Sequence, residues 1–140
     1  MKITVRNLQK KIKVSPAKIK EVARNIKPPV SLNNLELSLY FVENEVIKSL
    51  NRQFFEKDCL TDVISFRLSD DYAEVFIAPC VVKDNSLAFK VDFLEEVYRC
   101  VIHGILHVFG YKDEVRKEKV KMWKAQEKIL KKAKNLKRKA

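Results

Sequence analysis

The two histidines of this chain stand four residues apart, and this spacing is its clearest chemical signal. On a helix, His103 and His107 project from one face, one turn apart, so their imidazoles can bind one metal ion. Gly110 follows three residues later, where a helix can end on a left-handed residue and the chain can fold back. Asp113 completes the string H-x-x-x-H-x-x-G-x-x-D, the ligand spacing of zinc hydrolases whose third ligand follows a glycine turn. We therefore predict a metal site formed by the two histidines and Asp113.

The segment around the histidines predicts a buried helix with one narrow polar stripe. Residues 92–109 are apolar nearly all round, apart from a stripe formed by Glu96, Arg99, Cys100, His103 and His107. Two imidazoles are costly to bury unless their ring nitrogens have partners, and a metal ion supplies one partner to each ring. A histidine pair at helical spacing can also be purely structural, but the buried context favours a metal. Cys100, one turn before His103, and Glu114, beside Asp113, are alternative third ligands.

The residue after His103 limits the reaction that such a site could catalyse. Three protein ligands leave one position open on a tetrahedral metal, as in catalytic zinc sites. Zinc proteases with this spacing carry a glutamate directly after the first histidine as general base, whereas this chain has Gly104. Peptide hydrolysis would need Glu114 or Glu74 to reach in instead. Phosphodiester cleavage depends less on a carboxylate base, because a metal and a cation can carry the developing charge. Gly104 would leave room beside the metal for a bulky substrate or for a backbone.

The composition indicates one folded domain in a reducing compartment. A chain of 140 residues predicts a single domain over residues 1–140. Its three cysteines lack a C-x-x-C spacing and indicate reduced thiols. No apolar run reaches transmembrane length and no signal peptide is recognisable, so we expect a cytoplasmic protein without membrane contact.

The net charge of +11 is concentrated at the two ends of the chain. Residues 1–30 hold nine Lys and Arg against one Glu, and residues 115–140 hold twelve against two acidic residues. The intervening residues 31–114 hold eight against fifteen, so the body of the chain is acidic. Basic ends suit a nucleic acid partner, and they equally suit a solvated lysine-rich surface of the kind found in heat-tolerant proteins.

The hydropathy pattern predicts an α+β domain in which one mixed four-stranded sheet is packed with helices. Strands are expected near residues 2–6, 35–42, 62–68 and 73–78, and helices near 16–26, 43–54, 92–109 and from 115 to the late 130s. Residues 55–60 form a loop, and Pro79 ends the last strand. In the last helix the apolar positions predict a stripe that faces the core, with Met122 and Trp123 inside it: Val115, Met122, Trp123, Ile129, Leu130, Ala133 and Leu136.

Three blocks of the sequence carry recognisable motifs. Residues 103–111 read H-G-I-L-H-V-F-G-Y. Residues 50–52 read L-N-R, and residues 57–66 read K-D-C-L-T-D-V-I-S-F. Met122 with the run Q-E-K-I-L forms a third block in the last helix. Together these blocks resemble the YbeY family of bacterial metal-dependent endoribonucleases, and the resemblance extends over nearly the whole chain.

This resemblance implies a cytoplasmic, single-strand-specific endoribonuclease of ribosome maturation and quality control, including processing of the 16S rRNA 3′ end. It implies a mixed-sheet α+β fold with the metal helix at its centre. It also implies one metal ion, usually zinc, bound by His103, His107 and a third residue. The implied partners are ribosomal RNA and the small ribosomal subunit, with no membrane and no small-molecule cofactor.

The chain departs from the family pattern at positions that bear on catalysis. The family's third histidine ligand is Asp113 here, and a carboxylate oxygen is an accepted zinc ligand. The family's arginine before its glycine aligns with Phe55. A catalytically weakened RNA- or ribosome-binding protein with a retained metal site is therefore an alternative. For the enzyme we assign four further residues. Arg52, the nearest substitute for that arginine, and Ser65 are assigned as catalytic residues. Lys57 and Arg67 are assigned as RNA-binding residues.

Overall fold

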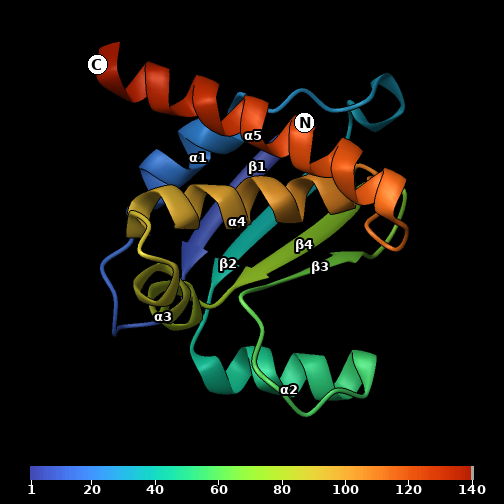
Figure 1. The fold of residues 1–140 in the computed structure, drawn as a ribbon. Helices are drawn as coiled ribbons and strands as arrows, with labels where there is room; N and C mark the ends of the chain where they lie inside the picture. Colours follow the sequence, from blue (N-terminus) through green and yellow to red (C-terminus); the bar gives the residue numbers. More distant parts are fainter. Residues whose placement is uncertain (140) are drawn as a thin grey trace.

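A computed structural model describes residues 1–139 of the chain, with side chains through residue 135, as one sheet that has helices on both faces (Figure 1). The strand order in the sheet is β1-β2-β4-β3. β1 (Lys2–Asn7) pairs in parallel with β2 (Glu36–Phe41), β2 pairs in parallel with β4 (Tyr72–Ile77), and β3 (Val63–Arg67) forms one edge, antiparallel to β4. The prediction of a mixed four-stranded sheet is confirmed.

Helices cover both faces of the sheet unequally. One side carries α1 (Pro16–Arg24), α4 (Phe93–Val108) and α5 (Arg116–Lys139), and the other carries α2 (Asn44–Phe55) (Figure 1). The remaining helical segments are the short 3-10 turn Val30–Leu32 and α3 (Pro79–Phe89). Because α4 packs against β3, β4, α1, α3 and α5, the central position expected for the histidine helix is confirmed. None of the helices in the described residues combines the length and apolar character needed to span a membrane.

The two faces of the sheet bury different sets of side chains. In β2, the alternate residues Leu37, Leu39 and Phe41 are buried in the main core, as the period-two pattern predicts. Each such burial stabilises the fold by about 1.5–3 kcal/mol. On the opposite face Tyr40 stacks on Phe76, in a second apolar cluster that includes residues of α2. The sheet is therefore fixed from both sides.

Helix α3 is not predicted by the sequence pattern. Pro79 ends β4, as expected, and also occupies the first turn of α3, where proline is favoured because its missing N–H would have no helical partner. The helix has no continuous apolar stripe, since Ser86 is buried whereas Leu87 and Phe89 are exposed. Its end is also unmarked by glycine, because Lys90 adopts the left-handed conformation (φ 56°).

Helix α5 contacts the core along a narrower stripe than the sequence predicts. Met122 and Leu130 are buried, as expected. Trp123 is 60% exposed and Val115 is 54% exposed, so the prediction that they face the core is wrong. Val115 precedes the helix, and Trp123 lies at the margin of the buried stripe, where its large ring stays in solvent. The side chain of Leu136 lies outside the described residues.

Gly104 sets how closely α4 approaches the sheet. A Cβ at this position would lie 2.6 Å from Cγ1 of Val75 and 3.0 Å from Cγ2 of Val63. Both distances are shorter than the optimal carbon separation of about 3.5–4.0 Å. The open side of the glycine is therefore filled by β3 and β4. The expectation that it leaves room beside a metal for substrate is wrong.

Gly104→Ala should destabilise the protein, although alanine is the better helix former. Helix propensity favours alanine over glycine by about 1 kcal/mol, whereas overpacking a core costs about 1–3 kcal/mol. Val75 is fully buried and β-branched, so its methyl groups have little freedom to move aside. We expect a lower urea midpoint for Gly104→Ala than for the wild type. An equal or higher midpoint would show that α4 has room to shift.

Candidate metal centre

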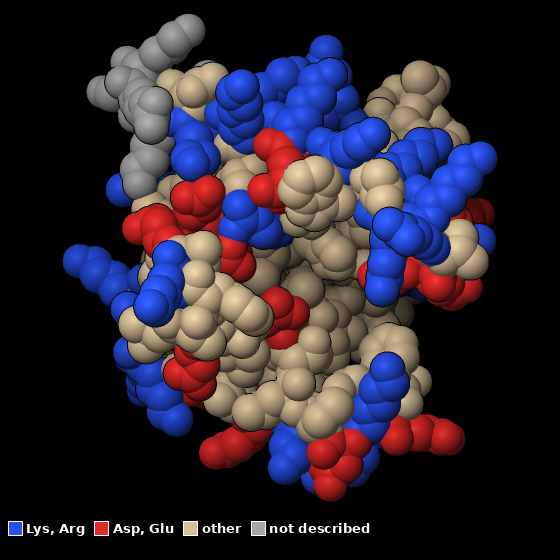
Figure 2. Space-filling view, in the orientation of Figure 1, with Lys and Arg blue, Asp and Glu red and all other residues tan. Residues whose placement is uncertain are grey.

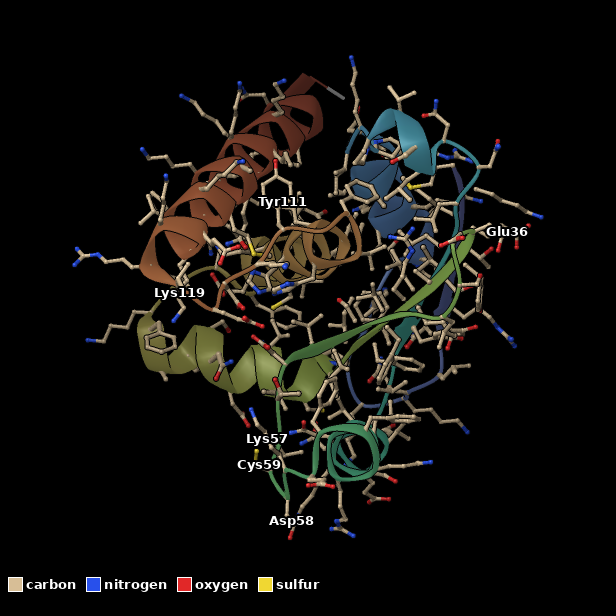
Figure 3. The ribbon with its side chains drawn as sticks, turned by 90° about the vertical axis from the view of Figure 1, so that its right-hand side faces the viewer. Glu36, Lys57, Asp58, Cys59, Tyr111 and Lys119 are labelled. Atoms are coloured by element: carbon tan, nitrogen blue, oxygen red, sulfur yellow. The ribbon has the colours of Figure 1, made fainter. Side chains whose placement is uncertain are left out.

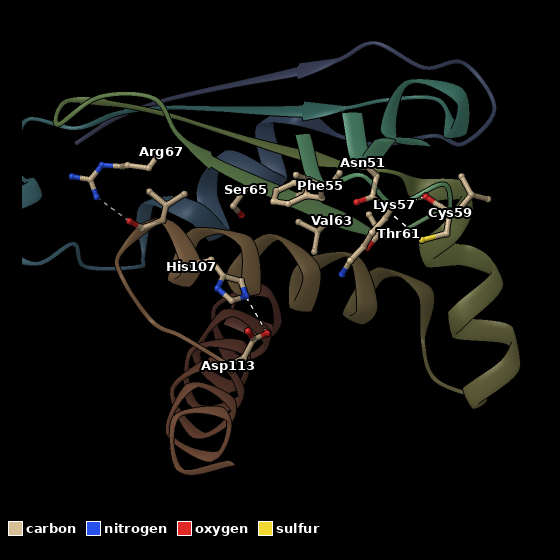
Figure 4. Close-up of a pocket in the computed structure, with 13 residues that line it drawn as sticks. Asn51, Phe55, Lys57, Cys59, Thr61, Val63, Ser65, Arg67, His107 and Asp113 are labelled. Carbon is tan, nitrogen blue, oxygen red and sulfur yellow. Dashed lines mark hydrogen bonds and ion pairs between the residues drawn. The ribbon is translucent and has the colours of Figure 1, made fainter. Parts of the chain in front are cut away.

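His103, His107 and Asp113 lie close enough together to share one metal ion. Nε2 of His103 lies 3.1 Å from Nε2 of His107, which lies 3.4 Å from Oδ2 of Asp113 (Figure 4). The three ligand atoms all lie within 4.8 Å of one another. Within the part of the chain that the structure describes, this is the only such group of His, Cys, Asp or Glu side chains. We name it the candidate metal centre.

A glycine turn at the end of α4 brings Asp113 back toward the histidines. Gly110 has φ +103°, a conformation that residues with side chains rarely adopt. Its N–H donates to the carbonyl of His107 (3.0 Å), and the N–H of Tyr111 donates to the carbonyl of Leu106 (3.0 Å). These two bonds form a Schellman motif, which satisfies carbonyls at the helix end while the chain reverses. The predicted helix end at this glycine is confirmed.

The hydrogen bonds of the two rings direct both Nε2 atoms toward the candidate metal centre. Nδ1 of His107 lies 3.1 Å from the carbonyl oxygen of Tyr111, which can only accept, so the ring donates from Nδ1. Nδ1 of His103 lies 2.7 Å from Oε1 of Gln126, again an acceptor. In the neutral rings each Nε2 then carries a lone pair and no proton, the form in which histidine binds metals. Two such lone pairs 3.1 Å apart repel each other, and a cation between them removes the repulsion.

This donor set fits a divalent metal ion. Zinc accepts imidazole nitrogen and carboxylate oxygen, and a tetrahedral ion with Zn–N bonds of about 2.0–2.1 Å holds two nitrogens about 3.3 Å apart. The observed 3.1 Å is close to that value. Cys100 does not belong to this group. Its buried thiol donates instead to Oδ2 of Asp62 at 3.5 Å, and burial, together with the charge of Asp62, raises the pKa of that thiol. Glu114 is exposed and also lies outside the group.

An open cavity of about 640 Å³ borders the candidate metal centre. His107 and Asp113 line it together with residues of β3 and of the loop after α2 (Figure 4). Figure 3 shows this loop, marked by Lys57 and Cys59, below α4 and the turn that carries Tyr111. A cavity of this size is within the range of ligand sites, and its lining combines polar and apolar side chains.

Three of the four further residues assigned from the sequence line this cavity. Lys57, Ser65 and Arg67 belong to its wall, and Arg52 does not. Arg52 instead donates from Nε and Nη2 to Oδ1 of Asp58, at 3.1 and 2.6 Å, with both side chains largely exposed. The hydrogen bonds from Arg52 hold the pKa of Asp58 below its ordinary value. The structure therefore places this arginine outside the cavity.

Ser65 and Arg67 make hydrogen bonds that hold β3 against α4. Oγ of Ser65 donates to the carbonyl of Gly104 at 2.8 Å. Nη1 of Arg67 donates to the carbonyl of Val108 at 3.1 Å, where a cation also complements the negative end of the helix. The same guanidinium donates to two carbonyls of the β3–β4 turn. Both side chains therefore fix an edge strand beside the metal-binding face of α4.

Gln126 is the residue of the site that the sequence pattern did not predict. Its side chain is nearly buried and contacts His103. The sequence feature that could have identified it is a polar residue between Met122 and Leu130, on the face of α5 that is buried. A buried amide without a hydrogen-bond partner costs about 1–3 kcal/mol, so a residue of this kind implies a specific partner.

Known proteins are similar to this chain in sequence and in fold. The sequence model of a family described as Endoribonuclease YbeY matches residues 4–134, which include the whole candidate metal centre. An Endoribonuclease YbeY from Thermotoga petrophila is 35% identical over 102 residues, covering 71% of this chain and 68% of that protein. Another, from Treponema denticola, is 29% identical over 134 residues, covering 88% and 86%. The solution structure of TM1509 from Thermotoga maritima is similar with a TM-score of 0.70 and 27% identity, over 98% of this chain and 92% of that one.

Asp113→Ala should weaken metal retention far more than Glu114→Ala, although the two carboxylates are neighbours in the chain. The first change removes one of three donor groups, whereas Glu114 is exposed and lies outside the group. Metal content after dialysis against a limiting chelator, measured by mass spectrometry, tests this ranking. A greater loss of metal from Glu114→Ala would make Glu114 the third ligand. Equal metal content in the two variants would exclude both carboxylates as the third ligand.

Proposed function

Because this chain belongs to the Endoribonuclease YbeY family, we propose that it is a metal-dependent endoribonuclease of ribosome maturation and quality control. Its substrate would be single-stranded ribosomal RNA, including the 3′ end of 16S rRNA. The protein would act in the cytoplasm on the small ribosomal subunit. The observation that carries the proposal is the candidate metal centre, which borders an open cavity of about 640 Å³.

We assign His103, His107 and Asp113 as the ligands of one zinc ion. When bound, such an ion supplies Lewis-acid polarisation of a phosphate and activation of water at neutral pH. Lys57 would contribute a positive charge for a phosphate at the cavity wall. Arg67 has five N–H groups, and its three hydrogen bonds to carbonyls leave it further donors for RNA. Both cations support an RNA-binding role for this wall.

Phe55 stands where the family carries an arginine, and we assign it to base stacking. Its ring lines the cavity and is 48% exposed. It also stacks on Phe66, with the ring centroids 5.8 Å apart. A ring that is held on one side can offer its other face to an unpaired base, which supports a preference for single-stranded RNA.

Basic residues of α5 would attract RNA toward this side of the molecule. Figure 2 shows Lys and Arg gathered over α5, whereas the hollow in the middle of this face is lined mainly by uncharged residues. Attraction of this kind accelerates association and weakens with salt. The basic residues of the helix up to residue 134 are Arg116, Lys117, Lys119, Lys121, Lys124, Lys128, Lys131, Lys132 and Lys134.

Peptide hydrolysis by the zinc-protease route fits this site less well. A side chain at position 104 would run into Val75, so no general base can be placed there. Glu74 belongs to the opposite face of the sheet, where it accepts a hydrogen bond from the Tyr72 hydroxyl at 3.0 Å. Glu114 is exposed. Phosphodiester cleavage, which depends less on a carboxylate base, is therefore favoured.

A catalytically weakened RNA- or ribosome-binding protein is the second candidate function. It is favoured because both guanidinium groups already have partners within the protein. Arg52 is paired with Asp58, and Arg67 donates to three carbonyls. Phe55 brings no charge to the position where the family has an arginine. Such a protein would keep the candidate metal centre and the basic face of α5.

A cleavage assay on a short single-stranded RNA separates the two functions. With added zinc or manganese the wild type should cleave this RNA, and a matched duplex should resist. His107→Ala should reduce the rate roughly 100-fold or more, because a bound metal contributes several kcal/mol of charge stabilisation. Glu114→Ala is the control and should keep wild-type activity. Binding without cleavage by the wild type would support the second candidate, and undiminished cleavage by His107→Ala would contradict metal dependence.

A further inference from the structure

A hydrogen-bonded chain of side chains runs from the candidate metal centre to a cluster of ion pairs between α4 and α5. Oε1 of Gln126 lies 2.7 Å from Nδ1 of His103. Nε2 of Gln126 donates to Oε2 of Glu127 at 3.1 Å. Glu127 in turn accepts from Nε and Nη2 of Arg99, each at 3.0 Å. A histidine of the centre is therefore linked to charged groups that do not line the cavity.

The direction of the Gln126 amide decides which nitrogen of His103 carries the proton. With Oε1 toward the ring, Nδ1 donates and Nε2 keeps its lone pair for a metal. If the amide were turned by about 180°, its NH₂ group would donate to Nδ1 and the ring proton would move to Nε2. The ring would then present a proton where the ion must bind. The two directions differ little in shape, so neighbouring groups must select one.

The pair formed by Glu127 and Arg99 makes that selection. A carboxylate only accepts hydrogen bonds, so Glu127 pairs with the amide nitrogen of Gln126 and repels its oxygen. Burial raises the pKa of Glu127, but hydrogen bonds from Arg99 and Gln126 outweigh this effect and hold the pKa below its ordinary value. Arg99 is itself held by Glu95 and Glu96 on its own helix. Its side chain is only 25% exposed, which restricts its freedom to turn away.

His107 is held in a different way. Its Nδ1 bonds to the backbone carbonyl of Tyr111, a group that has no donor and cannot reverse its polarity. The main chain thus fixes the tautomer of this ring. Of the two histidines, His103 alone relies on a side chain whose donor and acceptor could exchange places.

We propose that Gln126 is a positioning residue that fixes the metal-binding tautomer of His103, and that Arg99 and Glu127 fix the direction of its amide. This role rests on the proposed metal centre and belongs to residues that need not touch the substrate. It accounts for a polar residue on the buried face of α5. It also accounts for a set of partly exposed ion pairs, which contribute little to stability on their own.

Zinc affinity tests this role without any RNA. Gln126→Leu keeps the approximate size of the side chain and removes the acceptor, whereas Gln126→Glu keeps an acceptor. Met122→Leu is a packing control on the same buried face of α5. In competition with a chromophoric chelator, we expect Gln126→Leu to bind zinc about 10- to 100-fold more weakly than the wild type. Gln126→Glu should recover most of this loss, and Met122→Leu should match the wild type.

Nitrogen-resolved NMR spectra of the metal-free proteins report the tautomer itself. Wild-type His103 should carry its proton on Nδ1, and Gln126→Leu should populate the form with the proton on Nε2. Glu127→Gln should also populate that form, because an amide in place of the carboxylate can accept or donate. Lys128→Gln is the matched control, since Lys128 is an exposed lysine of the same helix, and it should leave the tautomer unchanged.

Wild-type zinc affinity together with an unchanged tautomer in Gln126→Leu would overturn the role of Gln126. If Gln126→Leu changes the tautomer of His103 and Glu127→Gln does not, Gln126 would fix the ring without help from Glu127 and Arg99. A wild type that binds no zinc would contradict the proposed metal centre, and its metal-free NMR spectra would still decide whether Gln126 fixes the ring.

Discussion

Two imidazole rings meet through their Nε2 atoms, 3.1 Å apart, with an acceptor behind each Nδ1, and the candidate metal centre depends on that contact. Neutral rings in this geometry repel each other, so the contact calls for a cation. The rings stay in place because each has an acceptor behind it and because α4 is anchored in the core. Val101, Ile102 and Ile105 of this helix are fully buried, and each contributes about 1.5–3 kcal/mol. Core burial of that size holds the rings in a position that favours metal binding.

The two glycines of the chain serve this contact in different ways. Gly104 allows α4 to lie close to the sheet, so that Ser65 and Arg67 can bond the edge strand to the helix. Gly110 allows the chain to reverse and return Asp113 to the rings. The first is required by space and the second by backbone conformation, since a Cβ on Gly110 would meet nothing within 4 Å. Because α4 lies close to the sheet and the chain reverses after it, His107 and Asp113 both line the cavity.

Local spacing allowed the ligand group and the α+β fold to be predicted from the sequence. His103, His107 and Asp113 are brought together by one helix and one turn, which the residue types in that segment determine without help from the rest of the chain. Features that depend on contacts outside one helix or turn could not be predicted in this way. Arg52 pairs with Asp58, a residue of the loop after α2, and no periodicity in the sequence specifies that pairing. Gln126 acquires its partner only because α5 packs across α4, a contact that no spacing within either helix specifies.

The X-ray absorption spectrum of the metal that remains with the purified protein tests the central claim most directly. Two imidazoles and one carboxylate predict nitrogen and oxygen neighbours at about 2.0–2.2 Å, with the scattering pattern of two histidine rings. A sulfur neighbour at about 2.3 Å would instead bring Cys100 into the site. A protein that holds no divalent ion, even after loading with excess zinc, would contradict the account.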